Sequence, residues 1–349
     1  VIAATKKIDQ YESQASLIQE ARDSDIQVVL EEDLFTRDLR RVSSCANRMV
    51  ELFQREKFDL IHSHAAIPGF AAILCSKEAY GRCIPHISTV HAWGQEKASW
   101  MKLQDVFILN HVNAVHAVSH DVANFLVNEG VKKDLIHPIY NGCDFSRIDQ
   151  LVNDEVAVSS DEFQDKRGKF YIGTVADLSE RKGIKYLIEA IAGLPAEIRN
   201  CIQVILVGDG PEKESLQNKT RELGLQDVIN FVGYAANPYI YMKKFDLFVL
   251  PSLSEGLPVT LVEAMYLKIP VLTTEAQGNR EIVQKGLNGM MVPPRDSKKL
   301  TEAIELFLRN KEFYTSKTQE AYKWVVENFN RQKNFGQIFE LYDRLRANN

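Results

Sequence analysis

The chain has 349 residues, of which 45% are hydrophobic and 26% are charged, a composition typical of a globular protein with two domains. The formal net charge is −5, and neither half of the chain has the excess of Lys and Arg that nucleic-acid binding requires. The longest apolar stretch, residues 65–75, contains Pro68 and is shorter than the roughly 18 residues that cross a bilayer, so we expect no membrane-spanning helix.

Short β-branched apolar runs alternate with longer amphipathic segments, a rhythm typical of βαβ units that share a parallel sheet. In the first half of the chain this pattern predicts strands at residues 26–30, 60–62, 86–91, 114–118 and 136–140. In the second half it predicts strands at residues 170–175, 204–207, 229–232, 247–250 and 270–273. We therefore expect an α/β protein with two Rossmann-like βαβ domains.

The polar segment 144–168 separates the two sets of strands and is predicted to connect the domains. This gives an N-terminal domain over residues 1–150 and a C-terminal domain over residues 151–330. Residues 331–349 are expected to form a helix that packs back towards the N-terminal domain. Ligands of open α/β sheets bind beyond the carboxyl ends of the strands, so we expect the functional residues directly after strands, in a cleft between the facing domains.

The cysteines indicate a reducing compartment. Their number is odd and none of them has C-x-x-C spacing, which argues against a disulfide framework or a zinc knuckle. We expect free thiols at Cys45, Cys75, Cys83, Cys143 and Cys201. The chain opens on Val1 without a signal-peptide pattern, which leaves room for a natural start upstream.

The most informative segment runs from Pro251 to Met265 and follows a predicted strand. Pro258 suits the first position of a helix, where its missing N–H costs nothing. The amides of Val259, Thr260 and Leu261 are then expected to be free at the helix start, where the dipole favours an anion by roughly 0.3 to 1 kcal/mol. A phosphate is the expected ligand.

Two glutamates, Glu255 and Glu263, lie eight residues apart in this segment. The simplest interpretation is a loop carboxylate and a solvated helix face, but the apolar neighbours of Glu263 indicate that it needs a polar partner. A rise of 1.5 Å per residue separates the two carboxyl groups by about 12 Å, outside the roughly 5 to 9.5 Å of glycosidases. We therefore expect the two acids to have different roles.

Residues 254–265 resemble the E-x7-E signature of retaining glycosyltransferases of the GT-B fold and are most similar to glycosyltransferase family 4. Further segments match the family in the same order along the chain. In the second half they are Arg181-Lys-Gly183, Val204-Ile-Leu-Val-Gly-Asp-Gly-Pro211, Phe231-Val-Gly233, Asn279-Arg-Glu-Ile-Val283, Asn288-Gly289 and Val292-Pro-Pro294. In the first half they are Asp59-Leu-Ile-His-Ser-His64, Thr89-Val-His91, Ala117-Val-Ser119 and Tyr140-Asn-Gly-Cys-Asp144.

The resemblance implies roles for individual residues. Glu263 would hold the ribose hydroxyls of a nucleotide-diphosphate sugar, and Glu255 would hold hydroxyls of the transferred sugar. Lys182 would neutralise the leaving phosphate and His91 would touch the sugar, which makes Glu255, Lys182 and His91 the implied catalytic residues. The other implied donor-binding residues are Arg181, Gly208, Gly233, Tyr234, Gly256, Leu257, Pro258, Val259 and Thr260.

The chain departs from the family pattern at three places. Asp177 replaces the arginine of the usual Gly-Arg-Leu; it either turns away or, as we expect, pairs with a neighbouring cation while Arg181 approaches the phosphates. Pro258 lacks the amide that the family's commoner glycine donates. No strand with a glycine-rich loop is found before Ile26, so these elements are expected upstream of Val1 or are lost.

Two other patterns point to cofactors only weakly. His62 and His64 lie on one face of a predicted strand, but no third metal ligand follows at a fitting spacing. Gly208-Asp-Gly-Pro211 is similar to the opening of a dinucleotide fingerprint, but Lys213 replaces its third glycine. We therefore expect neither a metal nor a nicotinamide cofactor.

Together these features predict a metal-independent, retaining hexosyl- or N-acetylhexosaminyltransferase without a cofactor. Its donor substrate would be a nucleotide-diphosphate sugar and its acceptor a saccharide or lipid-linked molecule, in cell-surface polysaccharide or glycoconjugate synthesis. Two alternatives stay open: a nucleotide-sugar-binding protein without turnover, and a sugar-nucleotide epimerase of GT-B fold. We expect a cytoplasmic location, with peripheral contact at the inner face of the membrane if the acceptor is lipid-linked, and no nucleic-acid partner.

Overall fold

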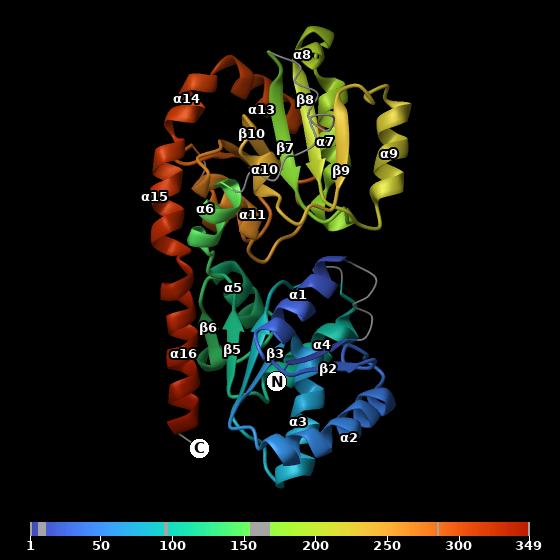
Figure 1. The fold of residues 1–349 in the computed structure, drawn as a ribbon, viewed down its shortest axis with the longest axis vertical. Helices are drawn as coiled ribbons and strands as arrows, with labels where there is room; N and C mark the ends of the chain where they lie inside the picture. The colour runs from blue at the N-terminus through green and yellow to red at the C-terminus, as the bar shows by residue number, and fades with distance from the viewer. Residues whose placement is uncertain (1, 6–11, 94–96, 154–167, 285, 348–349) are drawn as a thin grey trace. The chain divides into compact units, whose positions relative to one another are not determined.

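The computed structural model describes residues 2–5, 12–93, 97–153, 168–284 and 286–347 (Figure 1). The chain forms two compact units. Unit 1 comprises Val1–Ile139 and Gly336–Asn349, and unit 2 comprises Tyr140–Phe335. The division lies after Ile139 rather than at residue 150, because the next helix, α6 (Phe145–Asn153), packs within unit 2, where the Asn237 side chain donates to the Leu151 carbonyl at 2.8 Å.

The described part of unit 1 contains two parallel sheets. A four-stranded sheet has the order β3-β4-β5-β6, and its strands are β3 (Ile61–His64), β4 (His86–Val90), β5 (Ala114–Ala117) and β6 (Ile136–Pro138). A two-stranded sheet pairs β1 (Ile2–Thr5) with β2 (Val28–Glu31). The helices between the strands are α1 (Glu12–Asp23), α2 (Leu39–Glu56), α3 (Ala66–Tyr80), α4 (Ser99–Leu109) and α5 (His120–Asn128), with the short 3-10 helix η2 (Lys133–Leu135).

Unit 2 contains, within the described residues, one six-stranded parallel sheet of order β12-β11-β10-β7-β8-β9. Its strands are β7 (Phe170–Val175), β8 (Ile202–Val207), β9 (Ile229–Gly233), β10 (Leu247–Leu250), β11 (Val271–Thr274) and β12 (Met290–Val292). Its helices after α6 are η3 (Glu180–Lys182), α7 (Ile184–Gly193), α8 (Ala196–Asn200), α9 (Lys213–Glu222), α10 (Tyr239–Met242), α11 (Val259–Tyr266), α12 (Asn279–Ile282), α13 (Ser297–Arg309), α14 (Lys311–Ser316) and α15 (Thr318–Asn328).

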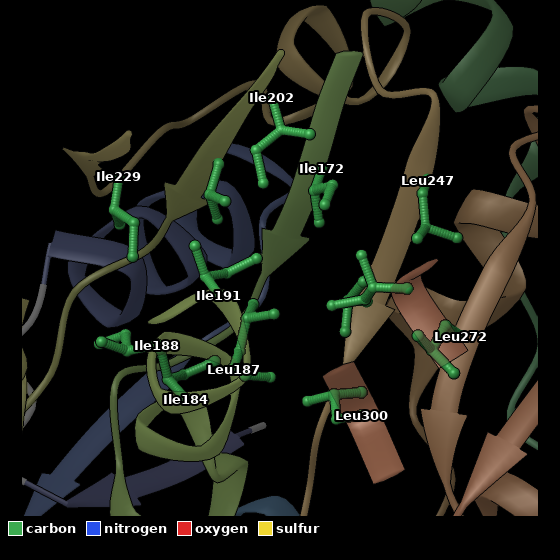
Figure 2. Close-up of a cluster of buried hydrophobic side chains, with 14 of the residues drawn as sticks. Ile172, Ile184, Leu187, Ile188, Ile191, Ile202, Ile229, Leu247, Leu272 and Leu300 are labelled. Atoms are coloured by element: carbon green, nitrogen blue, oxygen red, sulfur yellow. The ribbon is translucent and has the colours of Figure 1, made fainter. Parts of the chain in front are cut away.

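The core of unit 2 forms where α7 packs against the sheet. Ile184, Leu187, Ile188 and Ile191 recur at the three- and four-residue spacing of one helix face, and all four are buried. Figure 2 shows these side chains together with Ile172 and other buried residues of the strands and of α13. Full burial of each such side chain stabilises the fold by roughly 1.5 to 3 kcal/mol. This packing holds the ends of the strands in place.

Side-chain caps account for the starts of several helices. Asp38 accepts a hydrogen bond from the Arg40 amide at 2.9 Å at the start of α2. Ser119 caps α5 through the Val122 amide at 3.1 Å. Each cap accepts a hydrogen bond from an amide that has no partner inside its helix, and this bond stabilises the helix by about 1 kcal/mol. The capping residue therefore fixes where the loop ends and the helix begins.

The ten strands predicted from the sequence are all present, with ends shifted by up to two residues. Two strands are found in addition. β1 was not predicted because two of its four residues are alanines, which are depleted in strands, and β12 was not predicted because its sequence, Met-Met-Val, has a single β-branched residue. β1 corrects the expectation that no strand precedes Ile26, while the residues directly after β1, where the glycine-rich loop was sought, lie outside the described residues.

The segment 144–168 is not a continuous polar connection, because its first part forms α6. At the other end of the chain, α16 (Arg331–Ala347) is one helix, and its Leu341 is buried with Ile87 and Ala114 in unit 1. All five cysteines are free, as predicted. Among the described residues, no helix combines the length and the apolar character required to cross a bilayer.

Candidate functional site

The loops after β7 and β10 meet at one edge of the unit 2 sheet. The two strands are parallel neighbours, with Leu247 opposite Ile172, so their carboxyl ends lie at the same edge of the sheet. Gly183 has a φ of +63°, and a Cβ atom there would lie 2.2 Å from the Pro251 carbonyl oxygen. Only glycine allows this approach, and the Leu253 amide then bonds the Arg181 carbonyl at 2.8 Å.

Glu255 is the centre of the charged cluster at this edge. Its side chain is only 5% exposed, and three donors surround its carboxylate. Lys182 Nζ lies 2.7 Å from Oε1, Ser252 Oγ lies 2.6 Å from Oε1, and Arg181 Nη1 lies 2.8 Å from Oε2. Charge-assisted hydrogen bonds of this length are the strong ones, so the buried carboxylate is held in one orientation.

Asp177 lies at the exposed side of the same cluster. Its Oδ2 is 3.3 Å from Arg181 Nη2 and 3.9 Å from Lys182 Nζ, and its side chain is 50% exposed. Asp177 therefore pairs with a cation, as expected, but that cation is Arg181 itself, and the approach of Arg181 to the phosphates stays a prediction. Arg181 bonds both acids, so the cluster of Asp177, Arg181, Lys182 and Glu255 holds two positive and two negative charges.

Glu263 has the polar partner that its apolar surroundings demand. It is half-buried on α11, and the Tyr239 hydroxyl on α10 donates to its Oε1 at 2.8 Å. Burial raises the pKa of the Glu263 carboxyl, and the hydrogen bond from Tyr239 opposes that rise. Burial and the charge of Glu263 raise the pKa of the Tyr239 phenol, so the phenol remains the donor of this pair.

The start of α11 differs from the sequence prediction in two details. Pro258 occupies the N-cap with a ψ of 100°, one residue before the helix, because its extended backbone continues the preceding turn. The Leu261 amide donates to the Pro258 carbonyl at 3.1 Å, so it is not free for an anion. The candidate anion-binding amides are therefore reduced to those of Val259 and Thr260.

The remaining predicted donor-binding residues frame the same edge. The Gly208 amide donates to the Gly233 carbonyl at 2.7 Å, and a Cβ atom at Gly208 would lie 1.9 Å from the Ala176 carbonyl oxygen. This close approach brings the turn after β8 against the loop that carries Asp177. Tyr234 is 42% exposed directly after β9. Gly256 and Leu257 are buried before α11, where Gly278 packs against the Gly256 carbonyl.

His91 is the only one of the predicted site residues that lies in unit 1. It follows β4, and its Nε2 is 2.7 Å from Nδ1 of His64, the last residue of the neighbouring strand β3. The rings of His64 and His91 are nearly parallel with centroids 5.0 Å apart, and the rings of His62 and His64 are nearly parallel with centroids 4.8 Å apart. Burial and then the neighbouring histidines lower the pKa of His91 to about 4, so its ring is neutral at pH 7.

A chain of hydrogen bonds runs through the same sheet. The Ile139 carbonyl can only accept, so His116 Nε2 donates to it at 2.8 Å and His116 Nδ1 accepts from the Thr89 hydroxyl at 2.9 Å. Thr89 then accepts from His62 Nε2 at 2.6 Å, and the Tyr342 hydroxyl on α16 donates to His62 Nδ1 at 2.5 Å. Both imidazoles must be neutral for every bond in this chain to form.

The free energy of unfolding is expected to fall between pH 7 and pH 5 because of this chain. Burial, and then the neighbouring histidines, lower the pKa of His62 to about 3. An unfolded histidine binds a proton below about pH 6.5, whereas folded His62 does not do so until about pH 3, so acid favours the unfolded chain by about 2 kcal/mol at pH 5.

Urea unfolding of His62→Gln at both pH values is expected to show a smaller loss on acidification than the wild type. Exposed His111, replaced in the same way, serves as the matched control and should leave the wild-type difference unchanged. Equal losses in the wild type and His62→Gln would contradict the assignment.

Two contributors to the site were missed from the sequence. Ser252 lies three residues before Glu255 in the turn, a position from which a hydroxyl can reach back to the carboxylate, and this spacing could have identified it. Tyr239 is 24 residues from Glu263, and no local pattern links the two. Within the described residues there is no group of three or more His, Cys, Asp or Glu side chains that could hold a metal ion.

Comparison with known proteins identifies the family. A model described as Glycosyltransferase Family 4 matches residues 12–147, and a model described as Glycosyl transferases group 1 matches residues 158–324. The chain belongs to glycosyltransferase family 4. The fold of this family 4 glycosyltransferase is GT-B, the fold of solved structures such as that of Anabaena Alr3699/HepE in complex with UDP and glucose. That structure has a TM-score of 0.82 and 22% identity, over 94% of this chain and 89% of the other.

Two curated relatives of this family 4 glycosyltransferase illustrate the range of the similarity. N-acetyl-alpha-D-glucosaminyl L-malate synthase of Bacillus anthracis is 28% identical over 306 residues, which covers 85% of this chain and 77% of the relative. The amylovoran biosynthesis glycosyltransferase AmsK of Erwinia amylovora is 32% identical over 181 residues, covering 49% of this chain and 44% of the relative.

Proposed function

We propose that this family 4 glycosyltransferase transfers a sugar from a nucleotide-diphosphate sugar to an acceptor hydroxyl with retention at the anomeric carbon. The observation that carries the proposal is the buried Glu255 carboxylate, held by Lys182 and Arg181 at the edge where β7 and β10 end. Such an edge is the usual ligand-binding side of an open parallel sheet. The UDP and glucose in the structure of Anabaena HepE support a nucleotide-sugar donor.

Each group at this edge has a role that follows from its chemistry. Glu255 would accept hydrogen bonds from hydroxyls of the transferred sugar, and Glu263 would accept them from the ribose hydroxyls. Lys182 already lies 2.7 Å from Glu255, so its ammonium can bond the phosphate next to the sugar with little movement. Positioned charge of this kind is most effective where negative charge develops, which is on the leaving phosphate.

The proposed reaction takes place on one face of the sugar. The bond from the anomeric carbon to the phosphate oxygen breaks, a bond to the acceptor oxygen forms on the same face, and the acceptor proton passes to the leaving phosphate. The protein orients both substrates and neutralises charge, so no nucleophilic side chain and no metal is required. Lys182 and the amides of Val259 and Thr260 would stabilise the departing nucleoside diphosphate.

The acceptor is proposed to be a growing saccharide or a lipid-linked glycan in the synthesis of a polysaccharide or glycoconjugate. This part of the proposal is supported by the similarity to the amylovoran biosynthesis glycosyltransferase of Erwinia amylovora. The transferred group is proposed to be a hexosyl or N-acetylhexosaminyl residue, in line with the Bacillus anthracis relative.

Thermal unfolding in the presence of a panel of nucleotide-diphosphate sugars tests donor binding, because a ligand that binds the folded chain raises its stability. The donor that raises the melting temperature is then incubated with saccharide acceptors in EDTA, and the anomeric configuration of the product is read by NMR. Retention of configuration supports the proposal. Binding without transfer indicates a binding protein, a rearranged donor sugar without acceptor indicates an epimerase, and loss of transfer in EDTA contradicts metal independence.

Replacing Glu263 with Gln is expected to raise the donor KM by about 10- to 100-fold and to leave kcat within a few-fold, because the ribose loses charge-assisted hydrogen bonds worth about 1.5 to 3 kcal/mol. Tyr239→Phe, which removes the donor to Glu263 but keeps the carboxylate, should have a smaller effect on KM. The matched control is Glu189→Gln, a helix carboxylate of unit 2 that is 34% exposed and pairs with Lys219. An unchanged KM in Glu263→Gln would contradict the ribose role.

A further inference from the structure

We propose that Asp177 is an affinity-determining residue of the phosphate subsite, where its carboxylate competes with the donor's diphosphate for Arg181 and Lys182. The proposal rests on the proposed function and extends it to the release of the product. It starts from the geometry of one oxygen atom, Oδ2 of Asp177. This oxygen is 3.3 Å from Arg181 Nη2 and 3.9 Å from Lys182 Nζ, so it faces both cations of the cluster.

The two acids of the cluster are not equivalent. Glu255 is 5% exposed and accepts three hydrogen bonds of 2.6 to 2.8 Å, one of them from Ser252. Asp177 is 50% exposed, and the shorter of its two contacts with the cations is 3.3 Å. An exposed ion pair of that length contributes little to stability, whereas the buried carboxylate is costly to expose. An arriving diphosphate would therefore displace Asp177 from the cations and leave Glu255 in place.

The charge balance of the cluster determines how the displacement of Asp177 affects the affinity for the nucleoside diphosphate. Arg181 and Lys182 are already neutralised by Asp177 and Glu255, so the diphosphate meets a cluster without excess positive charge. Asp177 then remains near the phosphates as a like charge, because its backbone lies in the loop directly after β7. We expect the nucleoside diphosphate to bind more weakly than it would with a neutral residue at this position, and to leave faster after transfer.

The test compares Asp177→Asn and Asp177→Arg with the wild type by isothermal titration calorimetry. The probes are inorganic pyrophosphate and the nucleoside diphosphates UDP, GDP and ADP. We expect Asp177→Asn to lower the Kd of the nucleoside diphosphate that the wild type binds by about tenfold, and Asp177→Arg to lower it further. A structural role of Asp177 would not tighten binding, and the melting temperature of each variant verifies that it is folded.

The matched control is Glu302→Gln on α13. Its carboxylate is 49% exposed and pairs with Lys299 at 2.7 Å, so this variant removes an equally exposed charge from unit 2 without touching the cluster. The control should leave every Kd unchanged. Product inhibition gives a second readout, since the Ki of the nucleoside diphosphate should fall in parallel with its Kd in the Asp177 variants.

The outcomes separate this proposal from the proposed function. If the wild type binds a nucleoside diphosphate and Asp177→Asn binds it equally or more weakly, Asp177 positions Arg181 instead of competing with the ligand, and only this inference fails. If neither the wild type nor the two variants bind any probe, the result contradicts both the proposed nucleotide-sugar donor and the role of Asp177. Binding that appears only in the variants supports the competition directly.

Discussion

The Lys182→Met variant is expected to lose about 10²- to 10³-fold in kcat, because in the proposed reaction it removes one preorganised donor from the position where charge develops on the leaving phosphate. The side chain is 11% exposed, and Met occupies a similar volume, so packing is largely kept. The fall should appear in kcat measured at saturating donor, with a smaller change in KM, since in the proposed reaction the lysine bonds the phosphate more strongly as the sugar departs.

Lys185→Met is the control for this variant. Lys185 lies three residues further along the chain, its side chain is 40% exposed, and its ammonium is 4.0 Å from Glu180 instead of contacting Glu255. It should keep kcat within a few-fold of the wild type. A Lys182→Met enzyme with nearly full kcat would show that the leaving phosphate is neutralised elsewhere, with Arg181 as the first candidate.

The fold could be predicted where the sequence shows strong periodicity. The strands β7 and β10 have the bounds expected from their apolar runs, Phe170–Val175 and Leu247–Leu250, because polar or small residues flank each run on both sides. β12 could not be found in this way, since its place in the sheet is determined by pairing with β11 and not by its own residues. α6 was missed because its polar composition resembles that of a loop.

The residues of the candidate site could be named from the sequence, but the contacts between them could not. The resemblance to the family pointed to Lys182 and Glu255 as candidates, yet the 2.7 Å contact between them depends on two loops that lie about 70 residues apart in the chain. The occupied Leu261 amide follows from the tight first turn of α11, which single-sequence reasoning does not resolve. Tyr239 reaches Glu263 only because α10 and α11 are brought together by the fold.

Replacing Glu255 with Gln is expected to lower the free energy of unfolding by about 3 kcal/mol, because removing one partner of a buried ion pair leaves an uncompensated charge. Among the described residues, Lys182 would keep Asp177, at 3.9 Å, as its negative neighbour. Arg181, at 42% exposed, can turn to solvent, so most of the cost should come from Lys182. Transfer activity should also be lost, since the amide cannot replace the carboxylate that is proposed to accept hydrogen bonds from the sugar hydroxyls.

The double variant Lys182→Met/Glu255→Gln separates these two effects. With both charges removed, the buried position holds an apolar side chain beside a neutral amide, and urea unfolding should show that a large part of the lost stability has returned. Activity should not return, because the double variant lacks both charged partners that the proposed reaction gives to the sugar and to the leaving phosphate. If the double variant is as unstable as Glu255→Gln alone, the instability of the single variant does not come from unpaired Lys182, and the hydrogen bond from Ser252 becomes the next contact to test.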